Sequence, residues 1–424
     1  MKIPLASLGL RTQDISAAIE VLNSHQLTMG EKVRNFEKLM ADYLGVRNFV
    51  MVNSGSSANL VMIEALMRPS KSEPKLHSGD GVLVPAVAWP TTIWPLIQLG
   101  LRPIFVDVDP DTIAIDLEEA SKVIKGETNV RAVFPIHPLG YSIDGVSLDT
   151  FANQNNLILI HDVCESLGSW QDENHAGTIG KASSYSFYFS HHLTTMEGGG
   201  VATNDDDFAD DLRAIRSHGW SRDRNDAEYW SQLNNEKLLT QTVSKNQLKF
   251  QFITTGYNVR PMEIQAAIGI EQLKSLDSFI ERRRGIARQV KAILRNTVFS
   301  VVDGGTLEEE SSEKRHSWML IPIRIEIDLN PTLRALLDEL LDKYEIESRP
   351  VLTGNFLRQP VMQRMKGMPN PKKFTIAERI SQNYFMVGCH QDLTDSQVEY
   401  LCQKLNYIAQ KLESTEQGTS RVES

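Results

Sequence analysis

The stretch from Ser183 to Gly200, SSYSFYFSHHLTTMEGGG, places two adjacent histidines directly after an aromatic, strand-like run. An imidazole takes up and releases protons near neutral pH, so His191 or His192 could serve as a general acid and base. Neighbouring residues of a strand point to opposite faces, so the two rings can share one site only if the chain turns. The alternative is structural, with both histidines capping the turn.

A carboxylate lies at the end of another apolar run, since Asp162 is the second-to-last residue of the segment LILIHDV. The carboxyl end of a parallel strand lies at the ligand-binding edge of an open α/β sheet. A carboxylate there could hold the protonated ring nitrogen of a bound heterocycle and so make that ring an electron sink. A helix-capping role for Asp162 is the competing interpretation.

Two further segments could bind a flat, phosphorylated ligand. NSGSSAN, residues 53–59, lies between an expected strand and an expected helix, where free N–H groups, short hydroxyls and the helix dipole favour a phosphate. The segment lacks the GK[ST] ending of a nucleotide-binding P-loop, and an ordinary helix cap is the alternative. Trp89, in PAVAWPTT, could stack on a ring or belong to the core.

The overall composition narrows the class of partner. The chain has 424 residues, a net charge of -10 and no block of Lys or Arg, which argues against nucleic acid or an anionic membrane. No apolar run approaches the roughly 20 residues that span a bilayer, and no secretory signal pattern is present. Cys164, Cys389 and Cys402 are far apart, as expected of reduced thiols in a cytoplasmic protein. No spacing matches a metal-ligand set, so no metal is expected.

Short β-branched runs alternate with helical patterns through the first half of the chain. The runs lie at 48–54, 81–87, 103–109, 131–137, 156–163 and 184–190. Most are apolar at both odd and even positions, as expected for strands that helices cover on both faces. Their spacing fits βα units, which predicts an α/β fold with a mostly parallel, doubly wound sheet.

The second half of the chain indicates a smaller α+β domain. A polar stretch at 221–249 is expected to be a surface loop, and one long helix is predicted from Pro261, as its first residue, to about Leu294. We therefore expect a large domain at 1–260 and a small domain at 261–412 that includes this helix. A disordered tail is expected at 413–424.

Considered together and in this order, the motifs resemble one family. They are SGSSAN, AWPTT, Asp162-x-x-Glu165, SFYFSHHLTTMEGG and GYNVRPMEIQAAIG. The set is similar to that of the sugar aminotransferases that use pyridoxal 5′-phosphate (PLP), and the resemblance runs from about Leu5 to about Asn406. It implies the aspartate-aminotransferase-type fold, which is PLP fold type I, with the smaller C-terminal α+β domain.

In that family a lysine that binds PLP covalently follows the aromatic strand, and aligning the motif puts His191 at its position. This exchange resembles the branch of PLP-dependent nucleotide-sugar 3-dehydratases. The resemblance implies that PLP and its amine form, pyridoxamine 5′-phosphate (PMP), bind non-covalently, with L-glutamate as amino donor and release of ammonia. A related branch holds an iron–sulfur cluster, which does not fit because no cysteine lies between Ser217 and Gly256.

The resemblance also points to the substrate. It implies GDP-4-keto-6-deoxy-D-mannose, on the route to colitose in lipopolysaccharide O-antigen biosynthesis. The residues do not distinguish GDP from dTDP, CDP or UDP.

The resemblance implies a role for each remaining candidate residue. His191 and Asp162 would be catalytic. The cofactor-binding residues would be Ser56, Ser57, Trp89, Asp162, Glu165, Ser186 and Asn258. Asn258 would reach the phosphate from the neighbouring subunit, which implies a homodimer with shared active sites. Glu165 stands where aminotransferases usually have Gln, near the coenzyme's 3-hydroxyl. The candidates for contact with the sugar or its diphosphate are His218, Arg222 and Arg349.

Two other functions stay open at this point. One is a nucleotide-sugar aminotransferase anchored by another lysine, although Lys181 lies upstream of the strand. The other is a catalytically inactive PLP-binding regulatory protein, against which the intact Asp162, Ser186 and Asn258 argue.

Overall fold

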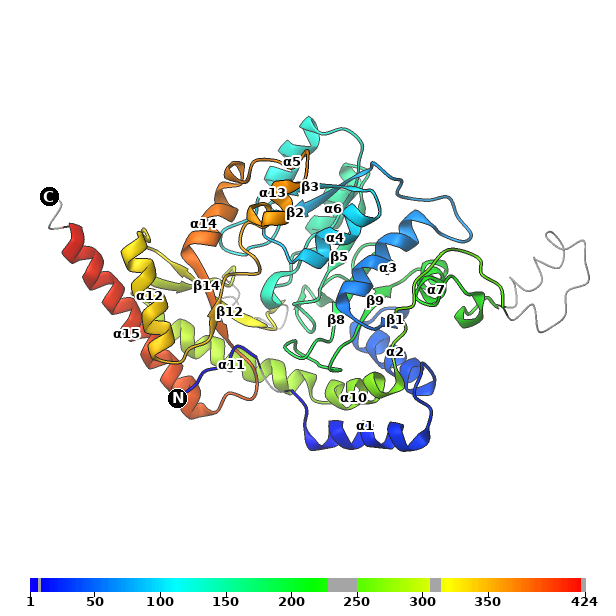
Figure 1. Cartoon of the computed structure of the whole chain (residues 1–424), viewed down its shortest axis with the longest axis horizontal. Helices are drawn as coiled ribbons and strands as arrows, with labels where there is room; N and C mark the ends of the chain where they lie inside the picture. The colour runs from blue at the N-terminus through cyan, green and yellow to red at the C-terminus, as the bar shows by residue number, and fades with distance from the viewer. Residues whose placement is uncertain (7–8, 228–249, 306–313, 421–424) are drawn as a thin grey trace, which may run out of the picture.

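The chain folds into a large lobe and a smaller lobe, each built on its own sheet (Figure 1). The computed structural model describes residues 1–6, 9–227, 250–305 and 314–420. Most of the predicted loop at 221–249 therefore lies outside the described residues. None of the helices in the described ranges is both long enough and apolar enough to cross a membrane.

The large lobe holds a seven-stranded sheet in the order β1-β9-β8-β5-β4-β2-β3. Its strands are β1 (Asn48–Val52), β2 (Gly81–Pro85), β3 (Arg102–Val106), β4 (Val130–Val133), β5 (Ile158–Asp162), β8 (Ala182–Ser186) and β9 (Gly199–Thr203). The pairs β2–β3, β2–β4, β4–β5 and β5–β8 are parallel, whereas β9 runs antiparallel to both β1 and β8. The predicted mostly parallel sheet is confirmed.

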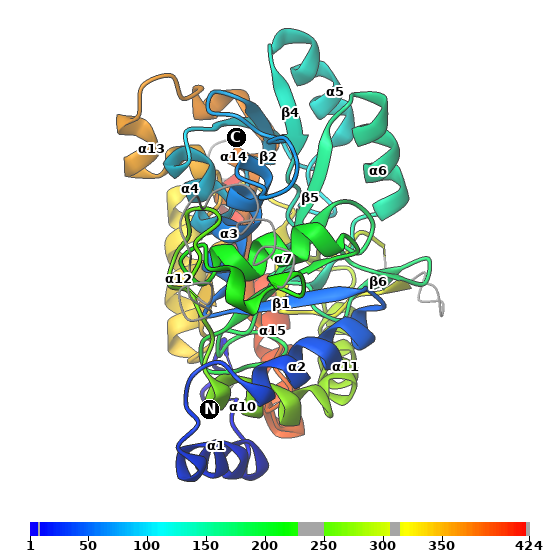
Figure 2. The same ribbon diagram turned by 90° about the vertical axis from the view of Figure 1, so that its right-hand side faces the viewer.

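Helices cover both faces of this sheet. They are α2 (Glu31–Leu44), α3 (Gly55–Met67), α4 (Pro90–Gln98), α5 (Leu117–Gly126), α6 (Gly145–Gln154), α7 (Asp206–Ile215) and α10 (Glu263–Leu273). Val82 and Val84 of β2 pack in one core with α3, α4 and α7, whereas Leu83 between them packs with α5 and α6. Figure 2 shows α4 and α6 on opposite sides of the sheet. This burial on both faces explains why the strands read as continuous apolar runs.

The small lobe is built on the antiparallel sheet β10-β12-β14-β13. These strands are β10 (Phe299–Val301), β12 (Leu320–Ile325), β13 (Ser348–Arg349) and β14 (Tyr384–Gly388), and the helices are α11 (Leu276–Leu294), α12 (Pro331–Lys343), α13 (Pro360–Arg364), α14 (Thr375–Asn383) and α15 (Asp395–Ser420). Ile3 is fully buried in the core of this lobe and pairs with Ile346. The first residues of the chain thus pack with the small lobe, although the predicted boundary places them with residues 1–260.

Two predicted segments differ from the structure. The single long helix is two, α10 and α11, with a break at Lys274 and Ser275, and α10 begins at Glu263 rather than Pro261. The break lets α10 pack on α1 (Thr12–Ser24) and α2 while α11 joins the small-lobe core. The predicted disordered tail is helical as far as Ser420, because α15 continues beyond the buried Leu412 without a proline to end it.

Besides the passage from α10 to α11, the segment before β12 also connects the two lobes. Strand β11 (Lys314–Arg315) pairs with β6 (Trp170–Gln171), which pairs with β7 (Asn174–His175) of the large lobe. Beyond β11, the Ser317 N–H donates to the Gly140 carbonyl at 2.9 Å, and the Met319 N–H donates to the Leu139 carbonyl at 2.9 Å. The segment that leads into β12 is therefore attached to the large lobe along its length.

Candidate active site

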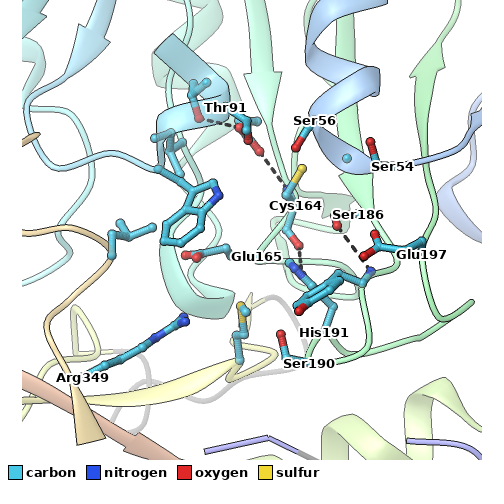
Figure 3. A pocket seen from close by; sticks show the side chains of 18 residues that line it. Ser54, Ser56, Thr91, Cys164, Glu165, Ser186, Ser190, His191, Glu197 and Arg349 are labelled. Carbon is cyan, nitrogen blue, oxygen red and sulfur yellow. Dashed lines mark hydrogen bonds between the residues drawn. The ribbon is translucent and has the colours of Figure 1, made fainter. Parts of the chain in front are cut away.

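A cavity of about 420 Å³ opens where β5 and β8 end, between the two lobes (Figure 3). It is lined by Ser54, Gly55, Ser56, Trp89, Thr91, Thr92, Ile136, Asp162, Cys164, Glu165, Ser186, Tyr188, Ser190, His191, Glu197, Met319, Arg349 and Leu352. Seven of the predicted site residues are in this set: Ser56, Trp89, Asp162, Glu165, Ser186, His191 and Arg349. The sheet topology thus brings together side chains that are almost 300 residues apart in the sequence.

One end of the cavity is the N-terminus of α3. The Ser54 side chain caps this helix by accepting from the Ser57 N–H at 3.1 Å. A Cβ atom added to Gly55 would lie 2.5 Å from Ser186 Cβ, so only glycine allows the helix to approach the end of β8 so closely. Hydroxyls of Ser54, Ser56 and Ser186 and the positive end of the helix therefore meet at one place, which suits a phosphate.

Asp162 lies across the cavity at the end of β5. Its Oδ2 accepts from Asn59 Nδ2 at 2.8 Å and from Thr92 Oγ1 at 2.7 Å, and its Oδ1 accepts from the Cys164 N–H at 3.0 Å. Only 5% of Asp162 is exposed. Three donors thus hold the carboxylate in one orientation, while Oδ1 keeps the capacity to accept a further bond from a ligand N–H.

The turn after β8 decides which histidine faces the cavity. Strand β8 ends at Ser186, and the His191 N–H donates to the Tyr188 carbonyl at 3.0 Å, which is the bend that the sequence pattern requires. His191 lines the cavity, whereas His192 is buried and its Nε2 donates to the Ser317 carbonyl at 3.1 Å. The structure therefore separates a cavity-facing imidazole from a structural one.

The tautomer of His191 follows from its hydrogen bond. Nδ1 lies 2.6 Å from the Cys164 carbonyl oxygen, which can only accept, so Nδ1 carries the hydrogen. In the neutral ring Nε2 then has a free lone pair. Burial lowers the pKa of His191 to about 4, with Arg349 and Arg283 adding to the effect and the Cys164 carbonyl opposing it. The ring is thus neutral near pH 7 and able to accept a proton.

Glu165 is a second titratable group in the cavity. Burial raises the pKa of Glu165 to about 7, and the charge of Asp162 adds to this, whereas Arg349 and the Leu139 N–H oppose it. The Leu139 N–H donates to Glu165 Oε2 at 3.1 Å. The carboxyl group is therefore poised between its neutral and ionised forms at neutral pH, which a glutamine at this position could not be.

Replacing Glu165 with Gln should change how stability depends on pH in the coenzyme-free protein. The folded-state pKa of about 7 exceeds the usual 4.5, so the stabilisation from the bound proton is full below about pH 4.5 and is lost as the pH rises through 7. We expect Glu165→Gln to be more stable relative to wild type at pH 8 than at pH 5, by on the order of 1–3 kcal/mol. Urea unfolding between pH 5 and 8 measures this, and parallel curves for the two proteins would contradict it.

Trp89 and Arg349 line the part of the cavity that lies away from α3. Trp89 is 45% exposed, so its ring is accessible to a flat ligand rather than part of the core. Arg349 comes from β13 of the small lobe, and its buried Nε has no hydrogen-bond partner among the described residues. Figure 3 shows its side chain directed toward the cavity from the side opposite α3. A cation in this position favours an anionic ligand.

Four predicted site residues lie outside this cavity. Ser57 contributes its N–H to the Ser54 cap but does not line the cavity. Asn258, His218 and Arg222 are exposed, and the main chain of Asn258 pairs with Ser217. Arg222 lines a separate cavity of about 650 Å³, beside α2 and α7. Within one chain these three residues do not reach the site, so their predicted roles require a second subunit.

The sequence reasoning missed the residues that support Asp162. Thr92 and Asn59 are both fully buried and donate to its carboxylate. Both belong to motifs singled out for other reasons, AWPTT and NSGSSAN. Polar residues near the start of two helices that begin at the same sheet edge are the available signal.

The residues present fit the coenzyme that the family resemblance implies. Asp162 suits a protonated ring nitrogen, and the serine cluster at α3 suits a phosphate. Trp89 is exposed enough to stack on a flat ring, and Gly55 at the start of α3 lines the cavity. The described lining includes no lysine, so a coenzyme bound here would have no amine for a covalent bond.

Comparison with known proteins agrees with this geometry. The model of the DegT/DnrJ/EryC1/StrS aminotransferase family matches residues 9–406. GDP-4-keto-6-deoxy-D-mannose 3-dehydratase of Yersinia pseudotuberculosis is 36% identical over 401 residues, covering 95% of this chain and 97% of the relative. The lipopolysaccharide biosynthesis protein RfbH of Salmonella typhimurium is 30% identical over 405 residues, covering 95% of this chain and 90% of that protein.

Solved structures give the same result. GDP-4-keto-6-deoxymannose-3-dehydratase (ColD), as a His-to-Asn mutant with bound GDP-perosamine, superposes with a TM-score of 0.83 at 34% identity, covering 95% of this chain and 100% of that one. The Escherichia coli enzyme with bound hydrated PLP has a TM-score of 0.82 at 34% identity, covering 96% and 99%. A further structure of this dehydratase holds a trapped PLP–glutamate geminal diamine, with a TM-score of 0.80 at 34% identity and coverage of 95% and 100%.

Proposed function

The chain belongs to the DegT/DnrJ/EryC1/StrS aminotransferase family, and from this premise we propose that it is a PLP-dependent nucleotide-sugar 3-dehydratase, a carbon–oxygen lyase. The substrate would be GDP-4-keto-6-deoxy-D-mannose, with L-glutamate as amino donor. The similarity to two such dehydratases over more than nine-tenths of the chain supports this choice of substrate.

The observation that carries the proposal is the cavity-facing imidazole of His191 in a site whose described lining has no lysine. Lys181, the other anchor considered, pairs with Asp205 before β8 begins and does not line the cavity. Among the described residues that line the site, a covalent aminotransferase mechanism therefore finds no amine. A firmly held carboxylate against the ring nitrogen matters most where the ring must take up electrons, and the three-donor support of Asp162 therefore argues for catalysis.

The coenzyme, when bound in its amine form, would supply the amine that joins the sugar's C4 ketone and a ring that takes up electrons. Asp162 Oδ1 would bind the ring nitrogen, and Ser54, Ser56, Ser186 and the N-terminus of α3 would bind the phosphate. His191 Nε2 would accept the proton that the reaction releases and return it to the departing C3 hydroxyl. Trp89 would orient the ring and exclude water from one of its faces.

The substrates are anions, and the cavity presents a cation to them. Arg349 faces the cavity from the small lobe, where it would bind a carboxylate of glutamate or the sugar's diphosphate in turn. Solved structures of the similar dehydratase contain GDP-perosamine in one case and a PLP–glutamate adduct in another. These support a site that takes both an amino acid and a nucleotide sugar.

We also propose that two copies of the chain share their active sites. Asn258, His218 and Arg222 are exposed and lie outside the cavity of their own chain. Large apolar side chains are also exposed in the His191 turn, at Tyr188 and Phe189, and close to Asn258 in the sequence, at Phe252 and Met262. Exposed apolar side chains of this size are what an interface between two copies would cover. Light scattering that gave the mass of one chain, 47.7 kDa, rather than twice that value would refute the dimer.

One assay separates the proposed function from its alternatives. Purified protein is incubated with PLP, L-glutamate and GDP-4-keto-6-deoxymannose, and ammonia, 2-oxoglutarate and the sugar product are followed. Dehydration should release ammonia and 2-oxoglutarate together and give a 3-deoxy-4-keto sugar. Amino sugar without free ammonia would identify an aminotransferase, and no turnover at all would favour the regulatory alternative. Parallel assays with dTDP, CDP and UDP sugars determine the nucleotide.

A further inference from the structure

Arg283 is a buried arginine that forms no ion pair with a carboxylate among the described residues, and Asp392 acts on its charge only through space. It lies in α11, is 1% exposed, and forms its hydrogen bonds in the described part of the chain to main-chain carbonyls only. Burial lowers the pKa of Arg283 to about 10, so the side chain still carries its charge near neutral pH. A buried cation without a carboxylate in direct contact is costly, which calls for an explanation beyond packing.

The three carbonyls belong to two segments that meet beside the active site. Nη1 donates to the Trp318 carbonyl at 3.1 Å and to the Met319 carbonyl at 2.9 Å, and Nη2 donates to the His191 carbonyl at 3.4 Å. Met319 itself lines the cavity. The guanidinium therefore joins the turn that carries His191 to the segment that leads into β12.

The segment that leads into β12 is held in place by hydrogen bonds to the large lobe. Its main chain is bonded to Gly140 and Leu139 of the large lobe, and the buried His192 donates to the Ser317 carbonyl. Leu139 in turn donates to Glu165. The turn at His191 is thus attached at two consecutive residues to a segment that both lobes hold in place.

We infer that Arg283 is a positioning residue for His191, holding the main chain of the turn so that Nδ1 stays on the Cys164 carbonyl and Nε2 stays available to take a proton. The inference rests on the proposed function for the meaning of that proton transfer. The planar, forked guanidinium of one side chain binds all three carbonyls. The single nitrogen of a lysine ammonium could not reach them in the same geometry.

The cation also acts on the ring through space. Arg283 lowers the pKa of His191, so its removal should raise that pKa. The other charged or titratable groups around the ring are Arg349 from β13, Asp162 at the end of β5, Cys164 and Glu165 just after it, Glu197 before β9, and Tyr188 and His192 in the same turn. None of these groups is itself substituted in an Arg283 variant, so a change in the titration reports on the loss of Arg283 and on any movement of the turn that it holds.

Three variants test the inference: Arg283→Met, Arg283→Lys and the control Arg282→Met. Arg282 is the neighbouring residue of α11 but binds Asp395 and the Leu393 carbonyl on another side of the helix. The first readout is the NMR titration of the His191 ring in coenzyme-free protein labelled with [¹³Cε1]histidine, with the resonance assigned by its loss in His191→Asn. The second readout is kcat and KM for dehydration.

In Arg283→Met we expect the His191 pKa to rise and kcat to fall about 10- to 100-fold, with KM for the sugar changed less than about threefold. Arg283→Lys keeps the charge but not the fork, so the titration should stay near wild type while kcat falls about fivefold. Arg282→Met should match wild type in both readouts.

Wild-type titration and wild-type kcat in a folded Arg283→Met protein would overturn the inference and leave Arg283 a purely structural residue. If Arg283→Met does not fold, a wild-type kcat in Arg283→Lys overturns it. The NMR titration does not depend on turnover. A wild-type protein that fails to dehydrate the sugar therefore refutes the proposed function and still leaves the role of Arg283 to be decided by the titration.

Discussion

His191→Asn is expected to lower the rate of dehydration by about a thousandfold or more, because it removes the proton carrier in the cavity while the surrounding turn is kept. The Asn side chain can donate to the Cys164 carbonyl in place of Nδ1, so the turn should stay folded. Binding of PLP, measured by its absorbance after gel filtration, should be within a few-fold of wild type. A variant that binds PLP and still dehydrates at more than about a tenth of the wild-type rate would contradict the role of His191.

The matched control is His192→Gln. His192 is also an imidazole of the same turn, but it is buried and donates from Nε2 to the Ser317 carbonyl, which the Gln amide can replace. We expect activity close to wild type. If instead His192→Gln loses activity and His191→Asn keeps it, the catalytic histidine has been assigned to the wrong residue of the pair.

His191→Lys tests whether an amine at the same position would bind PLP covalently. A lysine there would place an amine in a cavity whose described lining has none. We expect borohydride to fix PLP to this variant, seen as a mass increase, and not to the wild-type protein. Dehydration should be lost, because the amine would bind the coenzyme rather than carry the proton.

Asp162→Asn has the second-largest expected effect, a fall in dehydration of about a hundredfold to a thousandfold. The substitution removes the negative charge that would keep the coenzyme ring nitrogen protonated. It also introduces an amide N–H₂ among groups that already donate, namely Asn59, Thr92 and the Cys164 N–H. The affinity for PLP should fall as well, which fluorescence titration measures, while His191→Asn should leave it almost unchanged.

Thr92→Val is the graded control for Asp162. It removes one of the three donors to the carboxylate and keeps the charge and the shape. We expect a loss of activity smaller than that of Asp162→Asn, on the order of tenfold. Equal losses in the two variants would mean that the orientation of the carboxylate, and not its charge, is what the reaction needs.

Asp162 and His191 differ in how far the sequence alone identifies them. The position of Asp162 follows from a strand pattern, since the carboxyl ends of parallel strands meet at one sheet edge. Its partners Asn59 and Thr92 lie 103 and 70 residues away, and no local pattern pairs them with it. His191 was distinguished from His192 only by a family resemblance, because the turn that separates their directions is not visible in the sequence.

Local chemistry in the sequence was sufficient for the architecture. Strands that are apolar at both odd and even positions must be buried on both faces, which leads to a doubly wound parallel sheet. The serine-rich turn before α3 and the strand end at Asp162 both lie at the boundaries that the sequence predicts. These features depend on residues that are close together in the chain.

Contacts between distant segments decided the rest. The direction of His191 is set by a carbonyl 27 residues away, and its turn is attached to Arg283, 92 residues away. The break between α10 and α11 and the place of Ile3 in the small lobe likewise depend on which surfaces meet. Hydrogen bonds and packing between elements form only once the sheet order is established, and for that reason the acid–base geometry of the site is a property of the folded molecule.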